Sequence, residues 1–256
     1  MPSPLLVSLL LCALCLACDN KRQPTPSASA SASALLPPLT ARGWLEALPV
    51  PGAGAAEVSL PLGARSPRPV VVAIHGGDDR PEWQCGSYRH ASRSQGFVLC
   101  PRGVPRAGGE RFTLGSFEQS ATELRAALRA LKSRYGAHVA KEGLVLAGLG
   151  PGVEHALELA REEPSFFARL VLVDGSLARF SPALVTHYGQ RGGKRVLVAC
   201  GARCDPDIDA KLRSFRSAGV DARLLRVDGA RGLDARMVER LRESWGWLVS
   251  GEARWR

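Results

Sequence analysis

The segment from Gly143 to Val153 constrains the fold most strongly, because it joins an apolar strand, a glycine-rich turn and a helix. Residues 144–147 are consecutively apolar, as expected of a strand that is covered on both faces of a parallel sheet. Glycines at 148, 150 and 152 allow a turn that is too tight for side chains. Apolar residues then recur at helical spacing, at Val153, Ala156, Leu157 and Ala160. The segment therefore predicts a strand–turn–helix unit.

The rest of the chain repeats this alternation from Val70 onward. Buried strands are expected at 69–75, 96–101, 170–173, 196–199 and 222–227, and helices at 117–131, 208–215 and 238–248. The alternating segment 57–62 suits an edge strand, where Pro61 is tolerated. The pattern predicts an α/β fold over residues 44–256, a single domain with a mostly parallel sheet flanked by helices and the 144–147 strand at its centre. Functional groups are expected beyond the carboxyl ends of the strands.

The N-terminal residues form an apolar run that ends at Leu16-Ala-Cys18, although no Lys or Arg precedes it. This end resembles a bacterial lipobox, which implies removal of residues 1–17 as a signal peptide and lipidation of Cys18. An uncleaved anchor or an ordinary secretory signal are the alternatives. The Ser/Ala/Pro-rich residues 18–43 are predicted to be a flexible tether. We therefore expect a bacterial cell-envelope protein that is bound to the membrane through its lipid and faces the periplasm or the exterior.

Four further cysteines lie in the predicted domain, at Cys85, Cys100, Cys200 and Cys204. An even number in an exported chain indicates disulfides, and local pairing is the simplest of the three connectivities. No histidine stands near either pair at a spacing typical of zinc, so no metal site is expected.

The formal net charge is +10, but the basic residues are spread along the chain and do not form a cluster. They comprise 29 arginines and five lysines, so a preference for arginine explains the charge as well as a partner would. We do not expect nucleic acid as a partner.

Two motifs give the chain a family resemblance. Residues 148–152 read Gly-Leu-Gly-Pro-Gly where the nucleophile elbow has G-x-S-x-G, and His75-Gly-Gly77 follows a buried strand. Together with the order of strands and helices over about residues 57–249, they resemble the α/β-hydrolases, nearest in build to small single-domain esterases. A Rossmann-like nucleotide binder is the main rival, but its G-x-G-x-x-G pattern fails at Val153 and belongs to a first βα turn.

The resemblance implies a nucleophile at Gly150, where a glycine has no reactive group. The next residue, which should donate an N–H to an oxyanion, is Pro151 and has none. The same likeness implies a cleft formed by Leu149, Pro151 and the 75–77 motif, in which His75 has a structural role and the backbone of Gly76 and Gly77 forms the floor.

The same likeness requires an acid and a histidine base after later strands. Asp205 matches the acid position, although capping of the following helix, with Pro206 at its first turn, is its alternative role. Asp174 is a second candidate for the acid. The base should lie near residues 229–232, where Arg231 or a neighbour stands, and the last histidine of the chain is the earlier His187.

These observations leave three hypotheses about function. The first is a degenerate hydrolase that binds a small molecule or a protein in its cleft, without a cofactor. The second is an active hydrolase acting on esters, with Ser87 or Ser176 as the nucleophile beside Asp174 and a loop histidine. The third is a structural protein without a pocket, which a closed cleft would favour.

Overall fold

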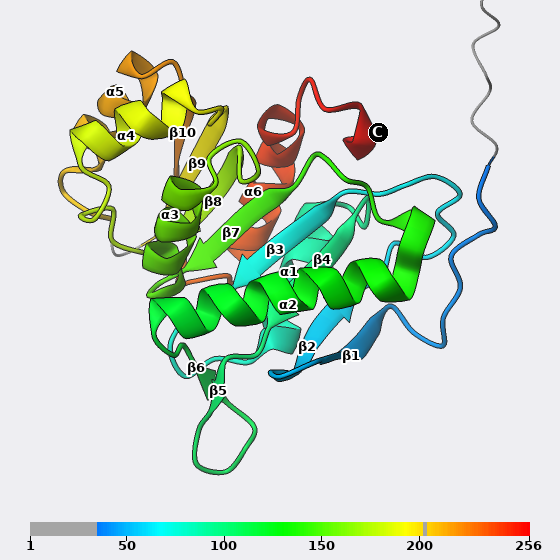
Figure 1. Ribbon diagram of the computed structural model, residues 1–256. Coiled ribbons are helices and arrows are strands. Elements are labelled where there is room, and N and C mark those ends of the chain that lie inside the picture. Colours follow the sequence, from blue (N-terminus) through cyan, green and yellow to red (C-terminus); the bar gives the residue numbers. More distant parts are fainter. Residues whose placement is uncertain (1–34, 202–203) are drawn as a thin grey trace, which may run out of the picture. The chain divides into compact units, whose positions relative to one another are not determined.

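An eight-stranded sheet in the order β1-β2-β4-β3-β7-β8-β9-β10 forms the centre of the protein. Figure 1 shows the computed structural model, which describes residues 35–201 and 204–256. Its strands are β1 (Leu45–Val50), β2 (Gly54–Ser59), β3 (Val70–Ile74), β4 (Phe97–Pro101), β7 (Val145–Leu149), β8 (Arg169–Val173), β9 (Arg195–Cys200) and β10 (Asp221–Arg226). The short strands β5 (Val104–Pro105) and β6 (Phe112–Thr113) pair as a separate hairpin.

The sheet is mostly parallel, which confirms the predicted fold class. Pairing is antiparallel between β1 and β2 and between β2 and β4, and parallel between all the other neighbours. Strand β7 lies inside the sheet between β3 and β8, as expected. The expectation that 57–62 forms an edge strand is wrong, because β2 lies between β1 and β4 and β1 occupies the edge. Pro61 lies beyond the end of β2 and therefore removes no ladder hydrogen bond.

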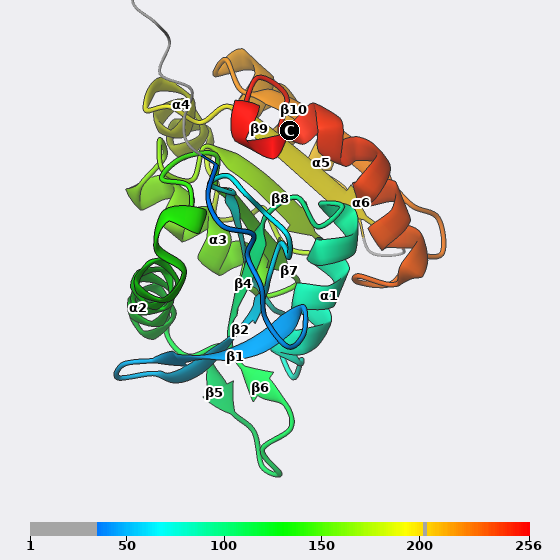
Figure 2. The same ribbon diagram turned by 90° about the vertical axis from the view of Figure 1, so that its right-hand side faces the viewer.

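Helices cover both faces of the sheet. They are α1 (Pro81–Ala91), α2 (Phe117–Tyr135), α3 (Gly152–Glu162), α4 (Pro182–Gln190), α5 (Ile208–Ser217) and α6 (Ala235–Leu248), with 3₁₀ turns at Gly136–His138 and Ala253–Trp255. Helices α2 to α5 pack in one apolar cluster and α1 and α6 in another, and Figure 2 shows the two groups on opposite sides of the sheet. The parallel strands are apolar at consecutive positions because both of their faces are buried. In β3, for example, Val72 belongs to the first cluster and Val71 to the second.

Residues before 44, where the sequence predicts the domain to begin, already pack against the domain. The N–H groups of Leu36 and Leu39 donate to the carbonyl oxygens of Arg65 and Ala64 at 2.9 and 3.0 Å, and the Leu39 side chain is buried. The predicted signal peptide, Cys18 and the tether up to residue 34 lie outside the described residues, and the tether boundary stays a prediction. Within residues 35–201 and 204–256, no helix is both long and apolar enough to cross a membrane.

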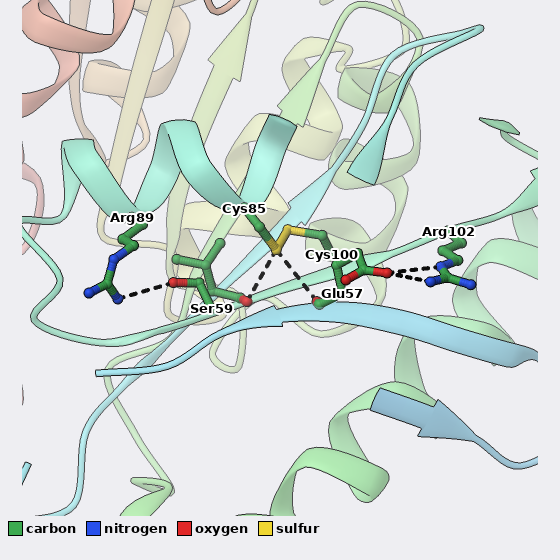
Figure 3. The surroundings of a disulfide bond; sticks show 7 residues. Glu57, Ser59, Cys85, Arg89, Cys100 and Arg102 are labelled. Atoms are coloured by element: carbon green, nitrogen blue, oxygen red, sulfur yellow. Dashed lines mark hydrogen bonds and ion pairs between the residues drawn. A yellow bond between two sulfur atoms is a disulfide. The ribbon is translucent and has the colours of Figure 1, made fainter. Parts of the chain in front are cut away.

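Both predicted disulfides are confirmed. Cys85 of α1 pairs with Cys100 of β4, and Cys200 at the end of β9 pairs with Cys204. Figure 3 shows the first disulfide beside β2, with Glu57 accepting a hydrogen bond from Arg102 Nε at 3.1 Å. Disulfides persist in oxidising compartments, so the pair of them indicates a periplasmic or extracellular location.

Candidate functional site

A cleft of about 640 Å³ lies at the carboxyl ends of β3, β7 and β8. Its walls come from the loop after β3, the turn between β7 and α3, the loop after β8 and one residue that follows β10. These are the strand ends at which open α/β sheets place ligands. A closed cleft would have favoured the third hypothesis, a structural protein without a pocket. The cleft is open in the structure, so this support for the third hypothesis is absent.

The turn between β7 and α3 is held in shape by close packing at two glycines. A Cβ atom at position 148 would lie 2.6 Å from the carbonyl oxygen of Gly152, and one at position 152 would lie 2.5 Å from that of His75. Gly150 differs, because a Cβ there would have no heavy atom within 4 Å, while its φ of +53° is one that side chains rarely adopt. A side chain at position 150 would therefore enter open space in the cleft, which is where the resemblance expects a nucleophile.

Few backbone N–H groups at the floor of the cleft are available to a ligand. Pro151 has none, the N–H of Gly150 donates to Val173 O at 2.9 Å, and that of Gly76 donates to Asp79 Oδ2 at 3.3 Å. The N–H of Gly77 forms no hydrogen bond within the part of the chain that the structure describes. One donor of the kind used in an oxyanion hole is therefore available on this side of the cleft.

The His75 side chain is buried beneath the backbone of the cleft floor and does not line the cleft. Its ring is 1% exposed, with Nε2 2.7 Å from Arg102 O and Nδ1 2.6 Å from Gly76 O. The side chain thus ties the loop after β3 to the residue that follows β4, which fits the structural role that the sequence predicts.

Asp174, one of three acidic residues that line the cleft, is hydrogen-bonded through both of its carboxylate oxygens. Its Oδ1 accepts from the N–H of Gly201 at 2.9 Å, and its Oδ2 accepts from the N–H of Gly232 at 2.8 Å. The backbone at Asp174 is itself left-handed, with φ of +46°. The carboxylate therefore joins the ends of β8 and β9 to the loop after β10, and both of its oxygens have backbone partners.

The two positions that the sequence matched to an acid and a base do not line this cleft. Asp205 Oδ1 accepts from the N–H of Asp207 at 2.9 Å. The N-cap residue of α5 is Asp207, two residues after the Asp205 that the sequence offered for this role. Arg231 is exposed, and Gly232 is the residue of its loop that reaches the cleft. The sequence located the loop after β10 correctly but could not show which of its residues faces inward.

His155 and Ser176 also line the cleft, from α3 and from the loop after β8. Burial lowers the pKa of the His155 imidazole, and Nδ1 of this ring has no hydrogen-bond partner among the described residues. Ser176 Oγ accepts from the N–H of Ala178 at 3.1 Å. No hydrogen bond joins Asp174, His155 and Ser176 to one another in the described chain, and Ser87 lies on α1, outside the cleft.

Among the described residues, no group of three or more His, Cys, Asp or Glu side chains is placed to hold a metal ion. The polar groups that line the cleft are three carboxylates, from Asp79, Glu154 and Asp174, with a half-buried imidazole, a hydroxyl and the N–H of Gly77. Glu154 is paired with Arg179 at 2.7 Å, so its charge is partly neutralised.

Several solved structures that are similar to this chain are hydrolases. An S-formylglutathione hydrolase from Agrobacterium tumefaciens is 14% identical, with a TM-score of 0.58 over 84% of this chain and 98% of its own. A dienelactone hydrolase from Anabaena variabilis is 16% identical, with a TM-score of 0.57 over 82% and 96%. The esterase PE8 is also 16% identical, with a TM-score of 0.55 over 72% and 94%.

These likenesses show that the chain has an α/β-hydrolase-like fold, as the elbow-like turn and the 75–77 motif predict. No protein-family model matches the sequence, and a comparison with curated proteins gives no significant match.

Proposed function

We propose that this protein is a cell-envelope lipoprotein whose α/β-hydrolase-like domain binds a ligand in the cleft without hydrolysing it. The observation that carries the proposal is the state of Asp174, whose two oxygens are occupied by the N–H groups of Gly201 and Gly232. In a hydrolase triad this carboxylate would orient a histidine, and here a glycine of the loop after β10 stands in that place.

The turn after β7 supports the same proposal. Gly150 has the conformation and the open space that a nucleophile would need, but it carries no side chain, and Pro151 has no N–H to donate. The nucleophile, the oxyanion donor and the histidine base act together in catalysis. The replacement of all three therefore favours a binding function over slow hydrolysis. The lipid anchor at Cys18 is proposed from the sequence Leu16-Ala-Cys18, and it agrees with the oxidising location that the disulfides indicate.

The test pairs a ligand screen with a panel of chromogenic esters on the purified protein. We expect no ester hydrolysis and at least one ligand that raises the unfolding midpoint, because a ligand bound only to the folded state stabilises it. A Gly77→Phe variant should lose that rise, since a Cβ at 77 already lies 3.8 Å from Pro151 in the cleft. The matched control is Gly246→Phe, where a Cβ has open space on the exposed face of α6.

The outcomes separate cleanly. A midpoint rise that Gly77→Phe abolishes and Gly246→Phe retains supports binding in the cleft. An equal rise in both variants places the ligand elsewhere and contradicts the proposal.

An active hydrolase is the second candidate, and one observation favours it. Ser176, Asp174 and His155 line the same cleft, and burial lowers the pKa of the His155 imidazole, which favours the neutral form that a general base needs. If this arrangement works, ester hydrolysis will be measurable in the wild type and lost in Ser176→Ala. Ser87→Ala is the control, because that hydroxyl lies on α1 away from the cleft.

A further inference from the structure

A second cleft, of about 320 Å³, lies at the opposite end of the sheet from the site described above. It opens where β7 and β8 begin, so the length of β7 separates the two clefts. Five strand residues at 3.3 Å each span roughly 16 Å. The first residue of β8, Arg169, forms part of its wall.

Arg169 is buried without the partners that a buried guanidinium requires. The residue is 4% exposed, and its Nε is fully buried with no hydrogen-bond partner among the described residues. Arg169 forms an ion pair with Glu252, but the 3.7 Å between its Nη1 and Glu252 Oε2 is beyond hydrogen-bond distance. Burial lowers the pKa of the guanidinium, because desolvation disfavours the charge. A buried cation with five donors and no hydrogen-bonded acceptor is costly unless a ligand supplies the acceptors.

Two exposed lysines add to the positive charge of this cleft. Lys141 and Lys194 line it, and neither forms an ion pair with a described residue. With Arg169 they give three cations against the carboxylates of Glu142 and Glu252. The side chain of Phe166, 42% exposed, lies at the same cleft and offers an apolar surface beside the charges.

We propose that this second cleft binds a phosphate group, either as free phosphate or at the end of a small phosphate monoester. The planar guanidinium of Arg169 matches two phosphate oxygens, and the two lysines supply point charges to the third. A doubly charged anion suits three cations better than a carboxylate does, and Phe166 provides a surface for the organic part of an ester. The proposal does not depend on what the first cleft binds.

The test uses the full chain, because its few lysines make footprinting simple. Acetylation with an amine-reactive ester is followed by mass spectrometry in phosphate, phenyl phosphate, acetate or chloride at equal ionic strength. Phosphate should protect Lys141 and Lys194 and leave Lys132 and Lys211 unchanged, with acetate weaker. Tighter protection by phenyl phosphate than by phosphate assigns a monoester, and equal protection assigns the free ion. No selective protection, or stronger protection by acetate, overturns the proposal.

Variants locate the charges that matter. Lys141→Ala/Lys194→Ala removes two exposed side chains and should weaken phosphate affinity by about tenfold or more, as expected for lost charge-assisted contacts. Arg129→Ala/Lys132→Ala, on the exposed face of α2, removes the same charge elsewhere and should leave the affinity unchanged. Arg169→Lys keeps the charge but loses the planar fork, so it should also weaken binding. If that buried variant fails to fold, the lysine pair decides. Equal weakening in the pair on α2 would show general screening and contradict the site.

Discussion

The two sides of the first cleft differ in what holds them in place. On one side, the turn between β7 and α3 is fixed by backbone packing at Gly148 and Gly152, where no Cβ fits. On the other side, the loops after β8, β9 and β10 are joined by the hydrogen bonds of Asp174. The first side has the shape of a nucleophile elbow, whereas the second presents the N–H of Gly232 to the Asp174 carboxylate.

The comparison separates shape from chemistry. Gly148 and Gly152 cannot gain a side chain unless the backbone of α3 or of the segment 74–75 moves, so folding alone accounts for these two glycines. At Gly150 and at Gly232, which faces Asp174, a Cβ would meet no backbone of another segment within 4 Å, so only their positive φ favours glycine there. A cleft can therefore keep the form of an active site after its reactive groups have been replaced.

The largest effect should come from Gly152→Ala. Its Cβ would lie 2.5 Å from His75 O and 2.6 Å from Ile74 O, which are backbone atoms of the central sheet. We expect the free energy of unfolding to fall by about 3–5 kcal/mol, as for a severe core clash. Gly150→Ala is the matched control and should cost only about 1–2 kcal/mol, from its positive φ. Urea unfolding measures both, and equal losses would end the distinction between the two positions.

The two disulfides should differ in how much each stabilises the fold, because they close loops of different length. Replacing Cys85 and Cys100 by alanine opens a closed loop with a sequence separation of 15 and should cost about 3 kcal/mol in the chain-entropy model. Replacing Cys200 and Cys204, separated by four residues, should cost about 2 kcal/mol, because the loop is shorter. Thermal unfolding of the two double variants ranks them, and a reversed order would contradict this account.

Asp174→Asn tests the second side of the cleft directly. The amide nitrogen would face a backbone N–H that now donates to a carboxylate, so one charge-assisted hydrogen bond is lost. We expect a loss of about 2 kcal/mol in the free energy of unfolding. Asp205→Asn is the control, because its exposed turn should change stability by less than about 0.5 kcal/mol. A neutral effect of Asp174→Asn would show that the three loops are held by other contacts.

The smallest effect concerns His155. Burial lowers the pKa of its imidazole in the folded state below the ordinary value of about 6.5, so the folded protein binds this proton less readily than the unfolded chain does. The stability is therefore complete above about pH 6.5 and decreases as the pH falls towards the folded pKa. Unfolding free energies between pH 7.5 and 5 should decline more steeply in the wild type than in His155→Gln. Parallel profiles would show that the ring is freely solvated.

The sequence predicted the features that follow from consecutive apolar residues and from glycine, namely the parallel strands, the turn after β7 and the central place of 144–147. It also predicted both disulfides from the number and spacing of the cysteines. It did not predict α1, whose buried face includes Gln84 and Cys85, or α4, which is short. The edge strand β1 and the choice of Asp174 over Asp205 depend on which segments meet in three dimensions. A one-dimensional pattern does not contain that information.

The most direct test of the central claim is labelling with a fluorophosphonate, which reacts with activated serine nucleophiles. The wild type and Gly150→Ser are incubated with the probe, and intact mass spectrometry measures the fraction labelled. The account predicts no labelling of either protein, because the loop after β10, where a hydrolase triad needs its base, has no histidine, and Pro151 would still offer no N–H. Stoichiometric labelling of the wild type that is abolished by changing one serine would contradict the account and identify an active nucleophile.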